Sequence, residues 1–251
     1  MNTRIKRLRV FAGPNGSGKT TLYNYLVRIR AFHSYFHINP DTIAHDLPVS
    51  VDLTNYPFDY TTEELIQFLD ESPFQKLVSY RMSNIVSLTN KIITLKENNI
   101  ENLSYPAAAI ADFIRKKCII SESSFSFESV FSHISKIDEI NDAKKVGFKT
   151  YLYFIATSDP LVNSNRVQAR VKNGGHSVPD DKILSRYYKT MENLYSMLMV
   201  FDNVFLFDTS NQNSSENFIF FAEKKDSVLH TTDTFVPQWF DKYVLKKQGI
   251  K

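Results

Sequence analysis

One short motif constrains the fold of this 251-residue chain more than any other part of it. The segment Leu8–Ala12, apolar except for Arg9, has the pattern of a short buried strand and leads directly into Gly-x-x-x-x-Gly-Lys-Thr at positions 13–20. Leu22, Leu26 and Ile29 then recur at helical spacing. A strand, a glycine loop and a helix in this order are the context in which the Walker A pattern forms a phosphate-binding loop. Three of the chain's seven glycines fall in this loop, so a chance glycine turn is a poor explanation.

Each residue type in this loop has a physical reason to be there. Glycines let the backbone adopt positive φ angles and turn its N–H groups inward, and the following helix adds its positive end. Lys19 is expected to reach the β- and γ-phosphates, and the Thr20 hydroxyl to bind Mg²⁺. The sequence therefore predicts a site for ATP and Mg²⁺, with these nucleotide-binding residues: Gly13, Pro14, Asn15, Gly16, Ser17, Gly18, Lys19, Thr20 and Thr21.

The rest of the chain alternates apolar strand patterns with helical ones, which predicts an α/β fold with a P-loop kinase-like central parallel sheet flanked by helices. Further strands are expected at 34–38, 125–128, 150–156 and 204–207, and further helices at 106–120, 134–146, 159–172 and 180–199. We expect one domain over 1–251 with a helical insertion at about 48–105. The insertion is expected to hold a helix that a capping pattern opens at Thr61–Glu64, and another over Phe74–Glu97. A C-terminal extension at about 211–251 is expected to hold a hairpin and an amphipathic helix.

Composition excludes several functions. The net charge of +3 is too small to argue for nucleic-acid binding. A single cysteine, Cys118, excludes a disulfide framework and any multi-cysteine metal site. No apolar stretch approaches the roughly 18 residues of a membrane span, and the first residues lack the pattern of a secretory signal. We expect a soluble, cytoplasmic protein with no membrane or nucleic-acid partner.

The class of P-loop protein follows from missing motifs. The sequence has neither the Asn-Lys-x-Asp guanine reader of regulatory GTPases nor the Leu-Ser-Gly-Gly-Gln signature of transporter ATPases. This favours a small-molecule kinase, in which the remaining catalytic groups come from loops at the carboxyl edge of the sheet.

Two acidic residues follow predicted strands and are candidates for this edge. Asp41 stands just past the second strand, where a carboxylate would accept the proton of an acceptor hydroxyl; the alternative is a helix N-cap. Glu128 ends the third strand, where it would organise Mg²⁺ through water or hold a substrate hydroxyl; the alternative is a structural salt bridge.

Two arginines precede a glycine pair. Arg166 and Arg170 are four residues apart on one helical face, and Gly174-Gly175 follows them, before a helix that carries Arg186. This pattern fits a lid that closes on the nucleotide and neutralises charge on the transferred phosphoryl group. The alternative is a solvated basic face with a break between two helices.

Several stretches in order resemble the zeta toxin family. They are Gly-Pro-Asn-Gly-Ser-Gly-Lys-Thr-Thr-Leu (13–22), Ile-Asn-Pro-Asp (38–41), Ser-Phe-Ser-Phe-Glu-Ser-Val (124–130), and Arg-Val-x-x-Arg-Val-x-x-Gly-Gly-His-x-Val-Pro (166–179). The likeness continues to Leu-Phe-Asp-Thr-Ser (206–210) and covers most of residues 5–210. The chain differs from better-studied members at Val130 and Ser132, where they have threonine and arginine.

The resemblance implies an ATP- and Mg²⁺-dependent kinase that phosphorylates a nucleotide-activated amino sugar, such as UDP-N-acetylglucosamine, and that a protein antitoxin blocks. It implies that Lys19 binds phosphate, that Asp41 is the general base, and that Arg166 or Arg170 contacts phosphate. Glu128 and His176 would belong to the substrate site. Outside this resemblance, the residues also allow an interaction module that binds ATP and phosphorylates no acceptor.

Overall fold

The computed structural model describes residues 5–33, 36–97, 100, 102–172, 178–210, 218–232 and 235–248. The chain divides into two compact units. One comprises Met1–Tyr35 together with Ser126–Lys251, and the other comprises Phe36–Phe125. The phosphate-loop motif lies in the first unit and Asp41 lies in the second. The second unit is thus wider than the insertion expected at about 48–105.

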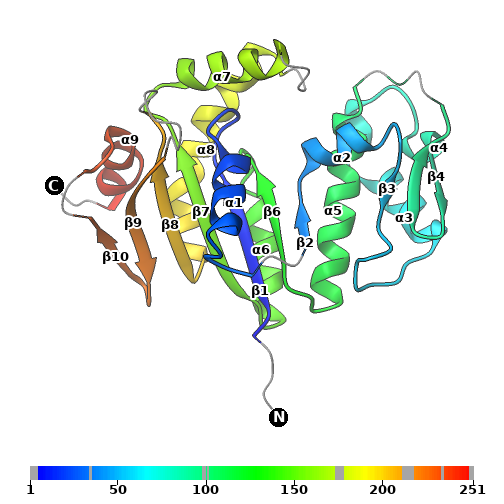
Figure 1. Cartoon of the computed structure of the whole chain (residues 1–251), viewed down its shortest axis with the longest axis horizontal. Helices are drawn as coiled ribbons and strands as arrows, with labels where there is room; N and C mark the ends of the chain where they lie inside the picture. The colour runs from blue at the N-terminus through cyan, green and yellow to red at the C-terminus, as the bar shows by residue number, and fades with distance from the viewer. Residues whose placement is uncertain are drawn as a thin grey trace. The chain divides into compact units, whose positions relative to one another are not determined.

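A mostly parallel sheet forms the centre of the first unit (Figure 1). Its strands lie side by side in the order β10 (Val228–Thr231), β9 (Ile219–Lys225), β8 (Asn203–Asp208), β7 (Lys149–Ala156), β1 (Arg7–Ala12) and β6 (Phe125–Ser129). Strand β7 runs parallel to both β1 and β8, whereas β9 runs antiparallel to β8 and β10. Strand β1 is central and buried from Leu8 onward, which explains why it is apolar there except at Arg9. The predicted α/β class with a central parallel sheet is confirmed, as is the hairpin near the C-terminus.

Helices cover both faces of this sheet, as predicted (Figure 1). Helix α1 (Lys19–Arg28) lies on one face, and α6 (Lys136–Lys145) and α8 (Asp180–Val200) lie on the other. Helix α7 (Pro160–Lys172) lies beyond the carboxyl ends of the parallel strands. Helix α9 (Gln238–Phe240), η2 (Asp241–Leu245) and η3 (Lys246–Gln248) form the expected C-terminal helical segment, with Trp239 buried. None of the helices in the described residues is long and apolar enough to cross a membrane.

An aromatic core fixes α1 against the sheet. Phe11 of β1 stacks on Tyr153 of β7 with 4.8 Å between ring centroids, and Leu22 and Leu26 of α1 are buried in the same cluster. Burying side chains of this size contributes about 1.5–3 kcal/mol each. The packing therefore holds the first residues of α1, and the glycine loop before them, at the carboxyl end of β1.

A charged contact lies at the amino ends of β7 and β8. We expect it to make the stability of the fold depend on pH. Asp202 accepts hydrogen bonds from the backbone N and Oγ1 of Thr150 (2.8 and 2.9 Å) and from Lys144 Nζ (2.8 Å). Burial raises the pKa of Asp202, but these hydrogen bonds outweigh burial, and the net pKa lies below its ordinary value. A carboxyl with a lowered folded-state pKa stabilises the fold above its unfolded pKa of about 4, and this stability is lost as the pH falls through the folded pKa.

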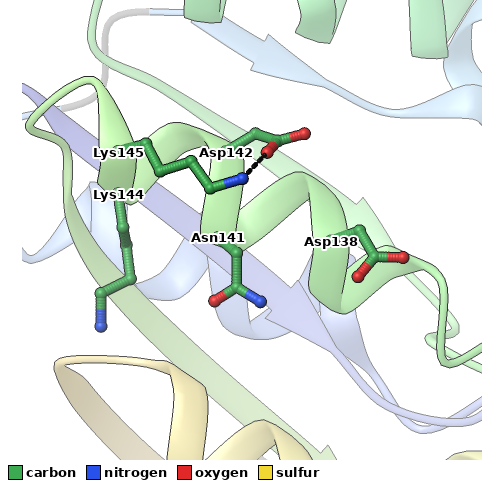
Figure 2. A pocket seen from close by; sticks show the side chains of 5 residues that line it. All are labelled: Asp138, Asn141, Asp142, Lys144 and Lys145. Atoms are coloured by element: carbon green, nitrogen blue, oxygen red, sulfur yellow. Dashed lines mark hydrogen bonds and ion pairs between the residues drawn. The ribbon is translucent and has the colours of Figure 1, made fainter.

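We therefore expect Asp202→Asn to lower the free energy of unfolding by about 1 kcal/mol at pH 7, and by less at pH 3. Urea unfolding at the two pH values measures the difference. Asp142→Asn is the matched control, because Asp142 forms an exposed ion pair with Lys145 on α6 (Figure 2), and such pairs contribute little. An equal loss at both pH values would contradict the proposed origin of the effect.

The second unit pairs helices with a small sheet. It contains β2 (Phe36–Ile38), α2 (Pro40–Asp46), α3 (Thr62–Glu71) and α5 (Ser104–Ile120), with a three-stranded sheet in the order β3 (Val51–Asp52), β5 (Ile92–Leu95), β4 (Val86–Thr89). The predicted capping pattern is present at α3: Thr61 Oγ1 accepts from Glu64 N, and Glu64 Oε2 accepts from Thr61 N. Helix α5 also begins near the predicted residue, and most of its residues from Pro106 to Cys118 are buried.

The helix expected over Phe74–Glu97 is wrong. This segment contains η1 (Pro73–Leu77), α4 (Met82–Ile85) and the antiparallel hairpin of β4 and β5. Asn90 and Lys91 have φ angles of 49° and 64°, and Thr89 pairs with Ile92 across them. Two consecutive residues with positive φ are typical of the two-residue turn that matches the twist of a hairpin. The apolar residues on either side of this turn therefore belong to two paired strands and not to one helix.

Candidate functional site

The glycine loop lies where β1 ends, flanked in the sheet by the ends of β7 and β6. The N–H of Gly13 donates to Ser129 O at the end of β6 (3.3 Å). Gly13 has a φ of 152°, and a Cβ at this position would lie 2.0 Å from Ile155 O of β7. Only glycine fits this approach, because any side chain would collide with the neighbouring strand. The loop is therefore fixed by both neighbouring strands of β1.

Inside the loop two polar side-chain atoms are buried without a hydrogen-bond partner among the described residues. They are Asn15 Oδ1 and Ser17 Oγ, and the Ser17 side chain is completely buried. Gly16 and Gly18 have φ angles of 72° and 96°, which is the backbone conformation that turns N–H groups inward. A buried donor without a partner is costly, so a ligand that accepts from Ser17 Oγ would compensate it. The loop thus has the donor set and shape that fit a polyphosphate.

The Lys19 side chain folds over the loop. Its ammonium donates to Gly13 O (3.0 Å) and Pro14 O (2.9 Å). Lys19 is the first residue of α1, after Gly18 in the N-cap position, so the charge stands at the positive end of the helix. An ammonium, the helix end and inward N–H groups together attract an anion with several phosphate groups.

Thr20 and Glu128 are in direct contact. Thr20 Oγ1 donates to Glu128 Oε2 at 2.9 Å, and the Glu128 side chain is only 7 % exposed. Glu128 lies near the end of β6, next to β1, so the sheet brings it to the loop, as expected from its place at a strand end. A hydroxyl beside a carboxylate is a donor set that suits Mg²⁺. The described residues contain no group of three or more His, Cys, Asp or Glu side chains suited to a metal ion.

Helix α7 carries one of the two predicted lid arginines to the end of β8. The Arg166 guanidinium donates to Thr209 Oγ1 (2.9 Å) and Thr209 O (2.8 Å). Burial lowers the pKa of Arg166, and the nearby Asp208 carboxylate opposes that shift. Arg170, one turn further along α7, is exposed. Gly174, Gly175 and His176 lie outside the described residues, so the hinge and the role of His176 stay predictions.

Asp208 holds the end of β8 in place. This side chain is 1 % exposed and accepts from Ser210 N (2.9 Å), Ser210 Oγ (2.8 Å) and Trp239 Nε1 (2.7 Å). Ser210 Oγ also accepts from Ser158 N just after β7 (2.8 Å). The ends of β7 and β8 are therefore tied to each other and to the C-terminal helical segment.

Asp41 lies in the second unit, in the first turn of α2. The N-cap of this helix is Asn39, whose side chain accepts from Asp41 N at 2.9 Å, and Pro40 follows at the first helical position. The alternative that Asp41 itself caps the helix is thus wrong. Its side chain is exposed, and its role as general base stays a prediction.

A surface depression of about 550 Å³ lies elsewhere, on α6 (Figure 2). It is lined by Asp138, Asn141, Asp142, Lys144 and Lys145, which all come from that one helix, and Asp142 and Lys145 pair with each other. None of the residues predicted from the sequence lies there. The candidate site is therefore the loop and the strand ends beside it.

Comparison with solved structures identifies the fold. A chain of the AvrRxo1-ORF1:-ORF2 complex with ATP aligns with 95 % of this chain and 63 % of its own length, at a TM-score of 0.57 and 14 % identity. A chain of the PezAT chromosomal toxin–antitoxin system of Streptococcus pneumoniae aligns with 100 % of this chain and 87 % of its own, at a TM-score of 0.51 and 13 % identity. This chain therefore shares the fold of these two chains, as the resemblance to the zeta toxin family implied.

Sequence comparisons are sparser. An uncharacterized protein of Haemophilus influenzae is 38 % identical over 63 residues, which are 25 % of this chain and 45 % of that protein. No family model matches. The chain therefore spans less than half of this curated relative and less than two thirds of the AvrRxo1 chain.

Sequence reasoning missed several polar residues of this site. Asn163 of α7 is completely buried, and its Nδ2 donates to Asn15 O in the loop at 2.6 Å. The available signal was its spacing: Asn163 lies four residues before the buried Val167, so a polar residue stands on the apolar side of α7. Thr157 and Thr209 follow strands β7 and β8 directly, and only the strand order brings both beside α7.

Proposed function

We propose that this protein is an ATP- and Mg²⁺-dependent kinase that phosphorylates a hydroxyl group of a small acceptor. The observation that carries the proposal is the Thr20–Glu128 hydrogen bond of 2.9 Å beside Lys19, in a loop whose backbone fits a polyphosphate. The fold supports it, since an AvrRxo1 complex of similar fold is described with ATP. The proposal places the reaction in the cytoplasm, where ATP is plentiful.

The residues divide the work as follows. The N–H groups of the loop hold the phosphates, and Lys19 exchanges its bonds to Gly13 O and Pro14 O for phosphate oxygens. Thr20 and Glu128 hold Mg²⁺, directly or through water. When bound, ATP supplies the phosphoryl group and Mg²⁺ neutralises phosphate charge.

Two further roles are proposed from the sequence. Arg166 and Arg170 neutralise charge that develops on the transferred group, with Arg166 held toward the end of β8 by Thr209. Asp41 accepts the proton of the acceptor hydroxyl. A nucleotide sugar such as UDP-N-acetylglucosamine is the first acceptor to try, because the motifs at 13–22, 124–130 and 166–179 resemble zeta toxins. A small protein antitoxin is proposed as a partner on the same ground, and the PezAT protein of similar fold belongs to a toxin–antitoxin system.

Phosphorus NMR tests the function directly. The purified protein is incubated with ATP, Mg²⁺ and UDP-N-acetylglucosamine, with Lys19→Ala as the control. A new phosphomonoester signal that is absent with the variant supports both the kinase and this acceptor. Inorganic phosphate alone supports ATP hydrolysis and directs the search to other acceptors. Binding of ATP with no turnover on any acceptor would overturn the kinase proposal in favour of an ATP-dependent interaction module.

A further inference from the structure

A buried asparagine joins the phosphate loop to the helix of the two arginines. Asn163 of α7 is 0 % exposed, and its amide has a partner at each end. Nδ2 donates to Asn15 O in the loop at 2.6 Å, and Oδ1 accepts from Thr157 Oγ1 just after β7. A backbone carbonyl can only accept, so the NH₂ group of Asn163 must face the loop, and the orientation of the amide is fixed.

The backbone of α7 also touches the loop at this point. A Cβ on Gly16 would lie 2.5 Å from Asn163 O, and Gly16 has a φ of 72°. One residue of α7 thus contacts two consecutive loop residues, Asn15 through its side chain and Gly16 through its carbonyl. A peptide carbonyl that faces a bound anion would repel it, whereas the Asn15 carbonyl is engaged by Asn163.

The same helix is held at the neighbouring strand ends. One turn beyond Asn163, Arg166 donates twice to Thr209 after β8. On the other side, Tyr187 of α8 donates to Thr157 O at 2.6 Å, which supports the residue that holds the Asn163 amide. A shift of α7 would therefore change the loop and the arginine together.

We propose that Asn163 is a positioning residue that holds the Asn15 carbonyl away from the ligand and keeps the loop in the conformation that binds the polyphosphate of a nucleoside di- or triphosphate. The inference rests on the proposed function, since it concerns the same loop. It adds a residue of α7 that touches no reacting atom and acts through the backbone of the loop.

The test replaces only the donor. Asn163→Asp keeps the size of the side chain and its acceptor toward Thr157, but places an oxygen against Asn15 O. We expect the dissociation constants of Mg·ATP and of inorganic tripolyphosphate to rise about 10-fold or more, measured by calorimetry. Asn163→Ala removes the donor without adding repulsion and is expected to weaken both ligands by about 3- to 10-fold, so it decides the test if the Asn163→Asp variant does not fold.

Two controls separate positioning from charge and from stability. Asn165→Asp makes the same chemical change at an exposed position of α7, and its affinities are expected to stay within about twofold of wild type. Asp202→Asn, at the opposite end of the sheet, removes the hydrogen bonds from Thr150 and is expected to lower the melting temperature while leaving tripolyphosphate affinity unchanged.

The outcomes are distinct. Folded Asn163→Asp and Asn163→Ala proteins that bind tripolyphosphate as wild type does would overturn the inference. So would an equal loss of affinity in Asn165→Asp, because the effect would then be one of charge. Wild-type protein that binds neither ATP nor tripolyphosphate would overturn the proposed function itself.

Discussion

Lys19→Ala is expected to lower the rate of phosphoryl transfer by about 10²–10³-fold, the usual effect of removing one charged group that stabilises a transition state. The Lys19 ammonium lies at the first helical position and bonds to Gly13 O and Pro14 O, so it already lies over the loop where phosphates are expected. Alanine would remove this charge and leave the backbone of the loop in place.

The fold is expected to tolerate this change. The Lys19 side chain is only partly buried, and its loss removes two hydrogen bonds to backbone carbonyls, so the melting temperature should change by no more than a few degrees. Transfer is measured by phosphorus NMR at saturating ATP and again at low ATP, which separates weaker binding from slower chemistry. Lys145→Ala on α6 is the matched control, since it also removes one positive charge. A Lys19→Ala protein that keeps more than a tenth of the wild-type rate would remove Lys19 from the mechanism.

The parts of the fold that could be predicted are those that local patterns decide. The strand, loop and helix at residues 7–28 combine an apolar run, a glycine pattern and helical spacing, and each points to the same structure. The hairpin of β4 and β5 was missed because its apolar residues satisfy a helical period as well as alternation over so short a span. The turn at Asn90-Lys91 was the stronger signal, because asparagine tolerates positive φ.

The residues of the candidate site also divide into those that a local pattern predicts and those that it does not. Glu128 was predicted because a residue at the end of a parallel strand comes to the edge of the sheet wherever that strand lies. Asn163, Thr157 and Thr209 could not be placed from sequence, because their meeting depends on the order β8-β7-β1-β6 and on the path of α7. Strand order results from long-range packing, which a local pattern does not report.

Asp41→Asn is expected to lower kcat by about 10²–10⁴-fold, while the dissociation constant of ATP stays within about twofold of wild type. An amide has the size of the carboxylate but cannot accept the proton of the acceptor hydroxyl. Helix α2 is expected to stay folded in this variant, because its N-cap is the Asn39 side chain. That side chain accepts a hydrogen bond from the backbone N–H of residue 41, which the substitution does not change.

The assay measures both quantities on the same preparation: calorimetry gives ATP affinity, and initial rates at saturating ATP and acceptor give kcat. Asp46→Asn, at the last residue of the same helix, is the matched control and is expected to keep wild-type kcat, because its charge change is the same. A specific loss of kcat in Asp41→Asn would mean that catalysis needs residues of both units, because the phosphate loop belongs to the first unit and Asp41 to the second. A rate within about threefold of wild type would mean that Asp41 only supports the start of α2, and that the acceptor proton leaves by another group.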